Sequence, residues 1–195
     1  MNRFVGTAAV LALIFFVPGA ATAEPLPQRA ITAEFFVPED RDNRDIRVAT
    51  LSLEEESHLT GGLWLRGAAG VAFTEGVLVP DHDPPVVELE ADGVGLGGSG
   101  FLRWRPVRVA RVAPFVEVGF GVLLTTEEFP PSGTFWNFNQ RYGPGVDLQL
   151  SDRLNVAIAY RHVHYSNGKG FGHPRNPSYD GDGVMFAISW GPRDP

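Results

Sequence analysis

The stretch FWNFNQRYGPGVDLQL, residues 135–150, alternates between two kinds of side chain along its length. Its odd positions from Asn137 to Gln149 are all polar or glycine, whereas most of its even positions are aromatic or aliphatic. A period of two is typical of a β-strand, because successive side chains point to opposite faces of a sheet. The stretch therefore predicts a long strand with one polar and one apolar face.

The same alternation recurs in segments that are separated by clusters of Gly, Pro, Asp and Asn. The other clear strands are 62–73, 95–105, 114–124, 154–166 and 182–190, and the stretch 29–58 is expected to supply two more. Residues 77–91 are expected to form a long loop or a frayed strand extension. The sequence thus predicts an all-β, eight-stranded antiparallel barrel, a size whose interior is filled by side chains and leaves no wide pore.

The alternation alone does not say which face of the barrel lies inside. A soluble barrel turns its apolar face inward, whereas a transmembrane barrel turns it outward to lipid. Segments of about 10 residues or more, with aromatic residues near their ends, favour the transmembrane barrel. These aromatic residues are Trp64, Trp104, Trp136, Tyr142, Tyr160 and Trp190. A soluble periplasmic barrel that binds an apolar ligand inside is kept as an alternative.

The N-terminus has the pattern of a secretory signal peptide. Arg3 supplies a positive start, residues 8–17 an apolar centre, and Ala21-Thr22-Ala23 a small-residue cleavage site. We therefore expect residues 1–23 to be removed and residues 24–195 to form one outer-membrane domain. The chain has no cysteine, which excludes disulfides and thiolate metal sites.

The charge of the chain bounds its partners. Its 16 basic and 23 acidic residues give a net charge of −7 at pH 7. Nucleic-acid binding needs a basic face for the phosphates. The composition therefore argues against a nucleic-acid partner.

Histidines concentrate in the strand predicted over residues 154–166. His164 and Ser166 share a face at a spacing of about 6.6 Å, which their side chains can close to a hydrogen bond. Ile158 and Tyr160 have the same parity, which places the pair on the lipid-facing side. His164 could therefore act as a base for Ser166.

Such a pair needs an acid that orients the imidazole and stabilises its protonated form. Asp180 and Asp182 lie in the lipid-facing row of the following strand, so either could come near His164. Asn167 and the backbone amides of the Gly168-Lys169-Gly170 turn could donate hydrogen bonds to an oxyanion.

Two other interpretations of this cluster stay open. His162, His164 and Asp182 could bind a metal ion, but no further ligand stands at a recognisable spacing, so we expect no metal and no cofactor. The polar strand end could also mark the lipid–water interface and be inert, with the two aspartates as turn residues. The remaining histidines, interpreted as surface or loop residues, are His58, His82 and His173.

The run YRHVHYSN, residues 160–167, followed by NPSYD, residues 176–180, resembles the signature of the PagL family of lipid A 3-O-deacylases. In that family an HxSN strand precedes a Gly-containing turn and an N-x-G-x-E/D segment. Weaker likenesses at 101–104, 114–121 and 138–145 extend the similarity over residues 61–190.

The resemblance implies an outer-membrane barrel of a Gram-negative cell, with a serine esterase site on its outer wall. Ser166 matches the family's nucleophile, His164 its base, Asp180 its acid and Asn167 a contributor to the oxyanion hole. Asp182 is the alternative acid.

Three positions depart from the family's pattern. Asp180 stands where the well-known member has Glu, which shortens the reach by one methylene, and Ser178 replaces the usual Gly. The turn through Gly168 and Gly170 differs from an Ala-Gly-Leu type, which leaves the backbone donor of the oxyanion hole unassigned.

The expected activity is that of a carboxylic ester hydrolase that removes the 3-O-linked acyl chain from lipid A of lipopolysaccharide in the outer leaflet. Lys169 and Arg175, near the rim, are expected contacts to lipid A phosphates. The alternative is a non-enzymatic small outer-membrane barrel with a structural or adhesive role. The acyl chains accepted and the formation of a homodimer are left open by the sequence.

Overall fold

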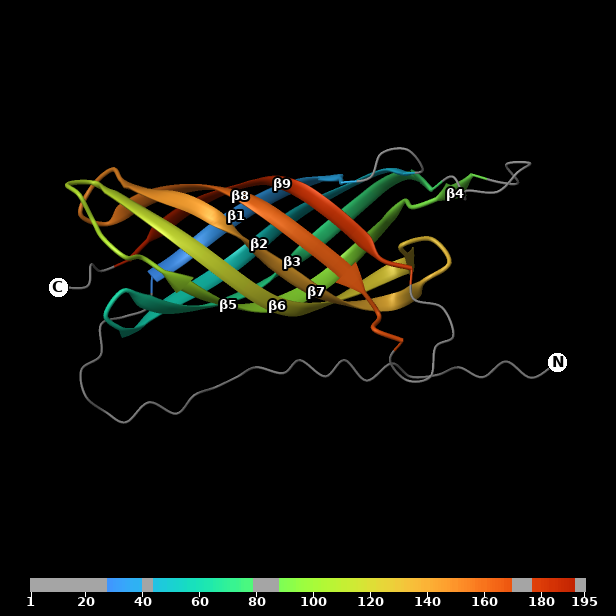
Figure 1. The fold of residues 1–195 in the computed structure, drawn as a ribbon, viewed down its shortest axis with the longest axis horizontal. Coiled ribbons are helices and arrows are strands. Elements are labelled where there is room, and N and C mark those ends of the chain that lie inside the picture. Colours follow the sequence, from blue (N-terminus) through green and yellow to red (C-terminus); the bar gives the residue numbers. More distant parts are fainter. Residues whose placement is uncertain (1–27, 40–43, 79–87, 170–176, 192–195) are drawn as a thin grey trace.

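The computed structural model describes residues 28–39, 44–78, 88–169 and 177–191, which form a closed β-barrel (Figure 1). The predicted signal peptide lies outside the described residues, as do His82, Gly170, His173 and Arg175. Within the described ranges there is no helix of the length and hydropathy that would cross a membrane.

Eight long strands make the wall of the barrel, and every pair of neighbours is antiparallel. They are β1 (Gln28–Pro38), β2 (Arg44–Thr60), β3 (Leu63–Leu78), β5 (Gly93–Trp104), β6 (Val112–Phe129), β7 (Thr134–Gln149), β8 (Leu154–Ser166) and β9 (Tyr179–Trp190). Pairing of β1 with β9 closes the ring. The two-residue strand β4 (Leu89–Glu90) pairs only with the end of β3. The predicted eight-stranded antiparallel barrel is confirmed.

Several strands are longer than the alternation predicts. The strand expected over 114–124 continues to Phe129, and the one expected over 62–73 continues to Leu78. Of the two alternatives for residues 77–91, the described part fits the strand extension, since Leu78 pairs with Leu89 of β4. The extension of β3 was missed because Glu75 interrupts the apolar face there, although the pairing of this strand with β2 continues.

The apolar face of the barrel points outward, as predicted. Leu53, Leu96 and Phe120 are each more than 60% exposed, and similar side chains cover the wall. A soluble protein rarely leaves so large an apolar surface open to water, whereas lipid accommodates it. The arrangement argues against the soluble barrel with an apolar lumen.

A charged cluster fills the barrel interior at the end away from β4. Glu117 on β6 accepts hydrogen bonds from Arg66, Arg103 and Arg161, and all four side chains are buried. The other members are Glu34, Glu54, Glu56, Arg105, Arg141 and Asp147. Two cavities between the described interior side chains measure only about 10 and 20 Å³. The interior is therefore packed with paired charges and holds no wide pore along the described strands.

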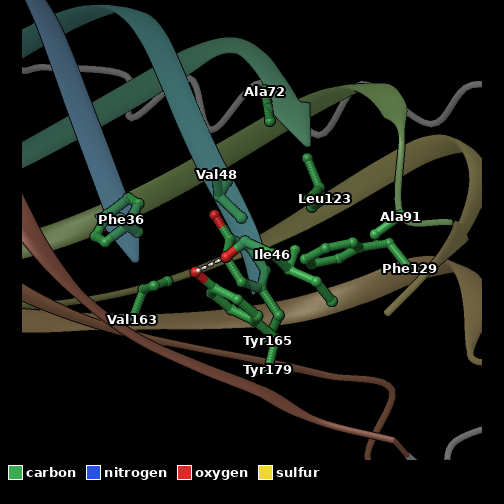
Figure 2. Close-up of a cluster of buried hydrophobic side chains, with 10 residues drawn as sticks. All are labelled: Phe36, Ile46, Val48, Ala72, Ala91, Leu123, Phe129, Val163, Tyr165 and Tyr179. Atoms are coloured by element: carbon green, nitrogen blue, oxygen red, sulfur yellow. Dashed lines mark hydrogen bonds between the residues drawn. The ribbon is translucent and has the colours of Figure 1, made fainter. Parts of the chain in front are cut away.

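The interior at the other end, where β4 lies, holds an apolar cluster (Figure 2). Three of its aromatic members, Phe129, Tyr165 and Tyr179, contact one another with ring centroids 5.6 to 6.1 Å apart. The Tyr179 hydroxyl donates a hydrogen bond to the backbone carbonyl of Ile46, at 3.2 Å. Because Tyr165 and Tyr179 face each other on β8 and β9, this cluster supports the inner side of that wall.

Candidate active site

β8 carries the candidate nucleophile and base on the outside of the barrel. His164 and Ser166 are partly exposed, whereas their neighbours Val163 and Tyr165 are buried in the interior apolar cluster. The strand therefore has the parity that the sequence predicts, with Ile158 farther along the same outer row. The two polar side chains therefore lie at the end of the apolar outer row, where the lipid-facing wall meets the rim of the barrel.

β9 brings one aspartate directly to His164. The strand register pairs His164 with Asp180, and the Nδ1 atom of His164 lies 2.6 Å from Oδ1 of Asp180. Both side chains keep about a third of their surface exposed. Asp182 contacts His162 instead, so the geometry selects Asp180 as the acidic partner of His164.

Ser166 lies on the same face, opposite Phe138 of β7. Among the described residues, no hydrogen bond joins the Ser166 hydroxyl to His164. The contact that the spacing predicts between these two side chains is therefore not formed in this structure. Hydrogen bonds between catalytic groups commonly tighten only when substrate is bound.

Asn167 lies at the start of the turn that follows β8. Its side chain is completely buried, and its Oδ1 accepts a hydrogen bond from the backbone N–H of Lys169, at 2.9 Å. Gly168 adopts a left-handed backbone conformation, with φ of 60°, which helps the chain to turn. The Asn167 side chain therefore stabilises the turn from within.

A second histidine–aspartate pair lies beside the first. The Nδ1 atom of His162 is 3.0 Å from Oδ1 of Asp182, and the Tyr160 hydroxyl is 2.5 Å from the same oxygen. The sequence interpretation assigned Tyr160 to an aromatic girdle and Asp182 to a fallback acid, so it missed this group. The shared parity of Tyr160 and His162 was the available signal, because His162 pairs with Asp182 in the β8–β9 ladder and Tyr160 lies two positions before it on the same face.

A metal site would need several histidine or carboxylate side chains grouped together. Across the described ranges, no three histidine, aspartate or glutamate side chains are grouped so that they could hold a metal ion. The chemistry that the arrangement offers is therefore that of a hydroxyl, an imidazole and a carboxylate in a row.

The fold and this row define a class: a small transmembrane barrel with the residue types of a serine esterase on its lipid-facing wall. The family model for lipid A 3-O-deacylase (PagL) matches residues 46–189, well over half of the chain. The protein belongs to this family, whose members are ester hydrolases.

Comparison with solved structures agrees with the fold. A crystal structure of the outer membrane enzyme PagL superposes with a TM-score of 0.55 at 18% sequence identity. The match covers 81% of this chain and 97% of that chain. No curated protein sequence matches the chain. The structural likeness supports an outer-membrane location.

Proposed function

We propose that this protein is an integral outer-membrane esterase that removes the 3-O-linked acyl chain from lipid A of lipopolysaccharide. Ser166 is the nucleophile, His164 the general base and Asp180 the acid that orients it. The observation that carries the proposal is the 2.6 Å contact between His164 and Asp180 on the lipid-facing side of the wall. A carboxylate that faces lipid is energetically costly, so a carboxylate paired with a histidine at this position indicates a function.

The reaction proceeds in two steps. His164 takes the proton of the Ser166 hydroxyl through Nε2, while the serine oxygen attacks the carbonyl carbon of the ester. The tetrahedral intermediate collapses with release of the sugar hydroxyl, which receives the proton from His164, and leaves an acyl-serine. Water, deprotonated by His164, then hydrolyses this ester and frees the fatty acid. Asp180 accepts a hydrogen bond from Nδ1–H of His164, which holds the ring in one tautomer. The same carboxylate stabilises the imidazolium in both steps.

The oxyanion of each intermediate needs hydrogen-bond donors beside Ser166. Backbone N–H groups of Asn167 and of the turn through Gly168 and Gly170 are assigned to this role. The buried Asn167 side chain supports the assignment indirectly, because its hydrogen bond to the Lys169 N–H fixes the turn.

The substrate reaches this site by lateral diffusion within the membrane. Phe138, half exposed and directly opposite Ser166, offers an apolar surface to an acyl chain. Lys169, exposed beside the site, and Arg175 are assigned to the lipid A phosphates.

The lengths of the connections between strands support a site in the outer leaflet. The two longest intervals between strands, 79–88 and 167–178, fall at the site end, whereas the intervals 61–62, 105–111 and 150–153 fall at the opposite end. Outer-membrane barrels have short periplasmic turns and longer external loops. The same proposal includes export of the protein with removal of residues 1–23. The mass of the mature protein tests whether the mature chain starts at Glu24.

The decisive test compares Ser166→Ala with the wild type on purified lipopolysaccharide in detergent micelles. We expect Ser166→Ala to lose the release of 3-O-linked fatty acid. Mass spectrometry of lipid A measures this release. Ser57→Ala is the matched control, because Ser57 also faces outward but lies on β2, away from the site. Equal release by wild type and Ser166→Ala would contradict the proposal. An unchanged lipid A acylation pattern in cells with and without the protein would favour the non-enzymatic barrel.

A further inference from the structure

Polar groups on the outer wall extend deeper than the proposed catalytic residues require. Beyond His164 and Asp180, the next pair in the β8–β9 ladder is His162 with Asp182, and Tyr160 joins it from β8. Below this level the row becomes apolar, with Ile158. Polar and charged groups that face lipid are costly, so an extra pair of this kind needs a reason.

Two donors hold the carboxylate of Asp182. The Tyr160 hydroxyl and Nδ1 of His162 both converge on Oδ1 of Asp182, at 2.5 and 3.0 Å. An ionised carboxylate only accepts hydrogen bonds, so Nδ1 of His162 carries a proton. The ring of Tyr142 packs against the imidazole with centroids 4.9 Å apart. These contacts fix the plane of the His162 ring.

The fixed ring turns its other nitrogen to Asp180. Nε2 of His162 lies 3.8 Å from Oδ1 of Asp180, the same oxygen that contacts Nδ1 of His164. Since Nδ1–H points to Asp182, only a ring protonated at both nitrogens presents an N–H from Nε2 to Asp180, whereas a lone pair there would repel the carboxylate. The inferred role therefore belongs to the doubly protonated ring. One carboxylate oxygen is thus flanked by two imidazoles, of which only His164 adjoins Ser166.

We propose that His162, held by Asp182 and Tyr160, is a positioning residue that orients the Asp180 carboxylate toward His164. The inference rests on the proposed function, since it concerns how Asp180 serves His164. His162 makes no contact with the nucleophile among the described residues, so it acts through Asp180 and not on the substrate. Its loss is therefore expected to lower kcat and to leave KM unchanged.

The test uses variants that keep the bulk of the wall. His162→Phe retains a ring against Tyr142 but removes both nitrogens, and it is expected to lower kcat about tenfold, within the range for contacting residues of one network. His162→Gln should recover part of this loss, because its amide N–H can occupy the place of Nε2. Tyr160→Phe should cause a smaller loss. Tyr142→Phe is the control, since it removes a hydroxyl from the same face and keeps the ring contact with His162.

A double variant separates positioning from a general structural effect. In an Asp180→Asn background, His162→Phe should cause no further loss of kcat, because the group through which it acts is gone. An equal loss in both backgrounds would overturn the inference, as would a His162→Phe enzyme with wild-type kcat. On unheated gels a folded barrel migrates differently from the unfolded chain, and this difference identifies the folded protein to be used in each assay. If His162→Phe does not fold, His162→Gln and Asp182→Asn take its place in the same cycle.

The outcome also distinguishes this inference from the proposed function. Ester release that survives Ser166→Ala would contradict the function itself. Release that requires Ser166 but is indifferent to His162 and Asp182 would contradict only the positioning role.

Discussion

Asp180 acts in the proposed mechanism through one hydrogen bond to Nδ1 of His164. Its short side chain reaches the imidazole because the two residues stand directly opposite each other in the β8–β9 ladder. Directly paired residues on adjacent antiparallel strands bring their Cβ atoms to about 5 Å, close enough for an aspartate. The pairing removes the need for the additional methylene of a glutamate.

The first prediction concerns this contact. Asp180→Asn keeps the shape of the side chain but no longer favours the His164 tautomer whose Nδ1–H is donated, so kcat should fall by about 10³-fold or more. Steady-state rates of fatty acid release measure the loss. Asp152→Asn, in an exposed turn at the opposite end of the barrel, is the control and should retain full activity. A small effect at Asp180 together with a large one at Asp182 would show that the other aspartate is the acid.

At the scale of the element, the β8–β9 wall holds its register partly through packing inside the barrel. Tyr165 and Tyr179 face each other across this ladder and pack with Phe129 in the apolar cluster (Figure 2). The Tyr179 ring lies over Gly181, where a side chain would occupy the same space. A β-carbon on Gly181 would come within 2.7 Å of the Tyr179 ring.

The second prediction follows from that close approach. Gly181→Ala should displace the Tyr179 ring and its hydrogen bond to Ile46, and lower the free energy of unfolding by about 1–3 kcal/mol. Urea unfolding in detergent micelles measures the change. Gly100→Ala is the matched control, because a β-carbon there meets no atom within 4 Å and points outward. Equal stability of the two variants would mean that the Tyr179 ring yields without cost.

At the scale of the whole molecule, closure of the barrel creates the charged cluster. Glu117 accepts hydrogen bonds from arginines on three different strands, β3, β5 and β8. Burial of charges is tolerated because each carboxylate meets guanidinium groups, and removal of one partner leaves the others uncompensated. The cluster fills the lumen and ties the strands together from within.

The third prediction tests the contribution of this cluster. Glu117→Gln should lower the free energy of unfolding by about 3–5 kcal/mol, because three buried arginines lose a shared counter-charge. Glu55→Gln is the control: Glu55 pairs with Arg29 on the exposed surface, and its change should cost less than about 1 kcal/mol. Urea unfolding of both variants gives the comparison. A Glu117→Gln barrel as stable as the control would show that the arginines find other partners or water.

Much of the fold could be predicted from residue order alone. The strand over residues 135–150 shows both its conformation and its two faces, because side-chain direction in a strand depends only on parity. The same rule put His164 and Ser166 on one side of the wall. The charged extension of β3 escaped prediction, since its pairing with β2 continues where the apolar pattern stops.

The sequence by itself therefore determined the strand pattern of the barrel, the two faces of its wall and the row that holds His164, Ser166 and the two aspartates. Only the tertiary structure decided which aspartate meets which imidazole, because a shift in strand register would exchange their partners. It alone also revealed the charged cluster, which pairs residues far apart in sequence. Glu34 and Arg141, for example, are separated by 107 positions. Parity is a local property of the chain, whereas register and ring closure arise only when distant strands pair.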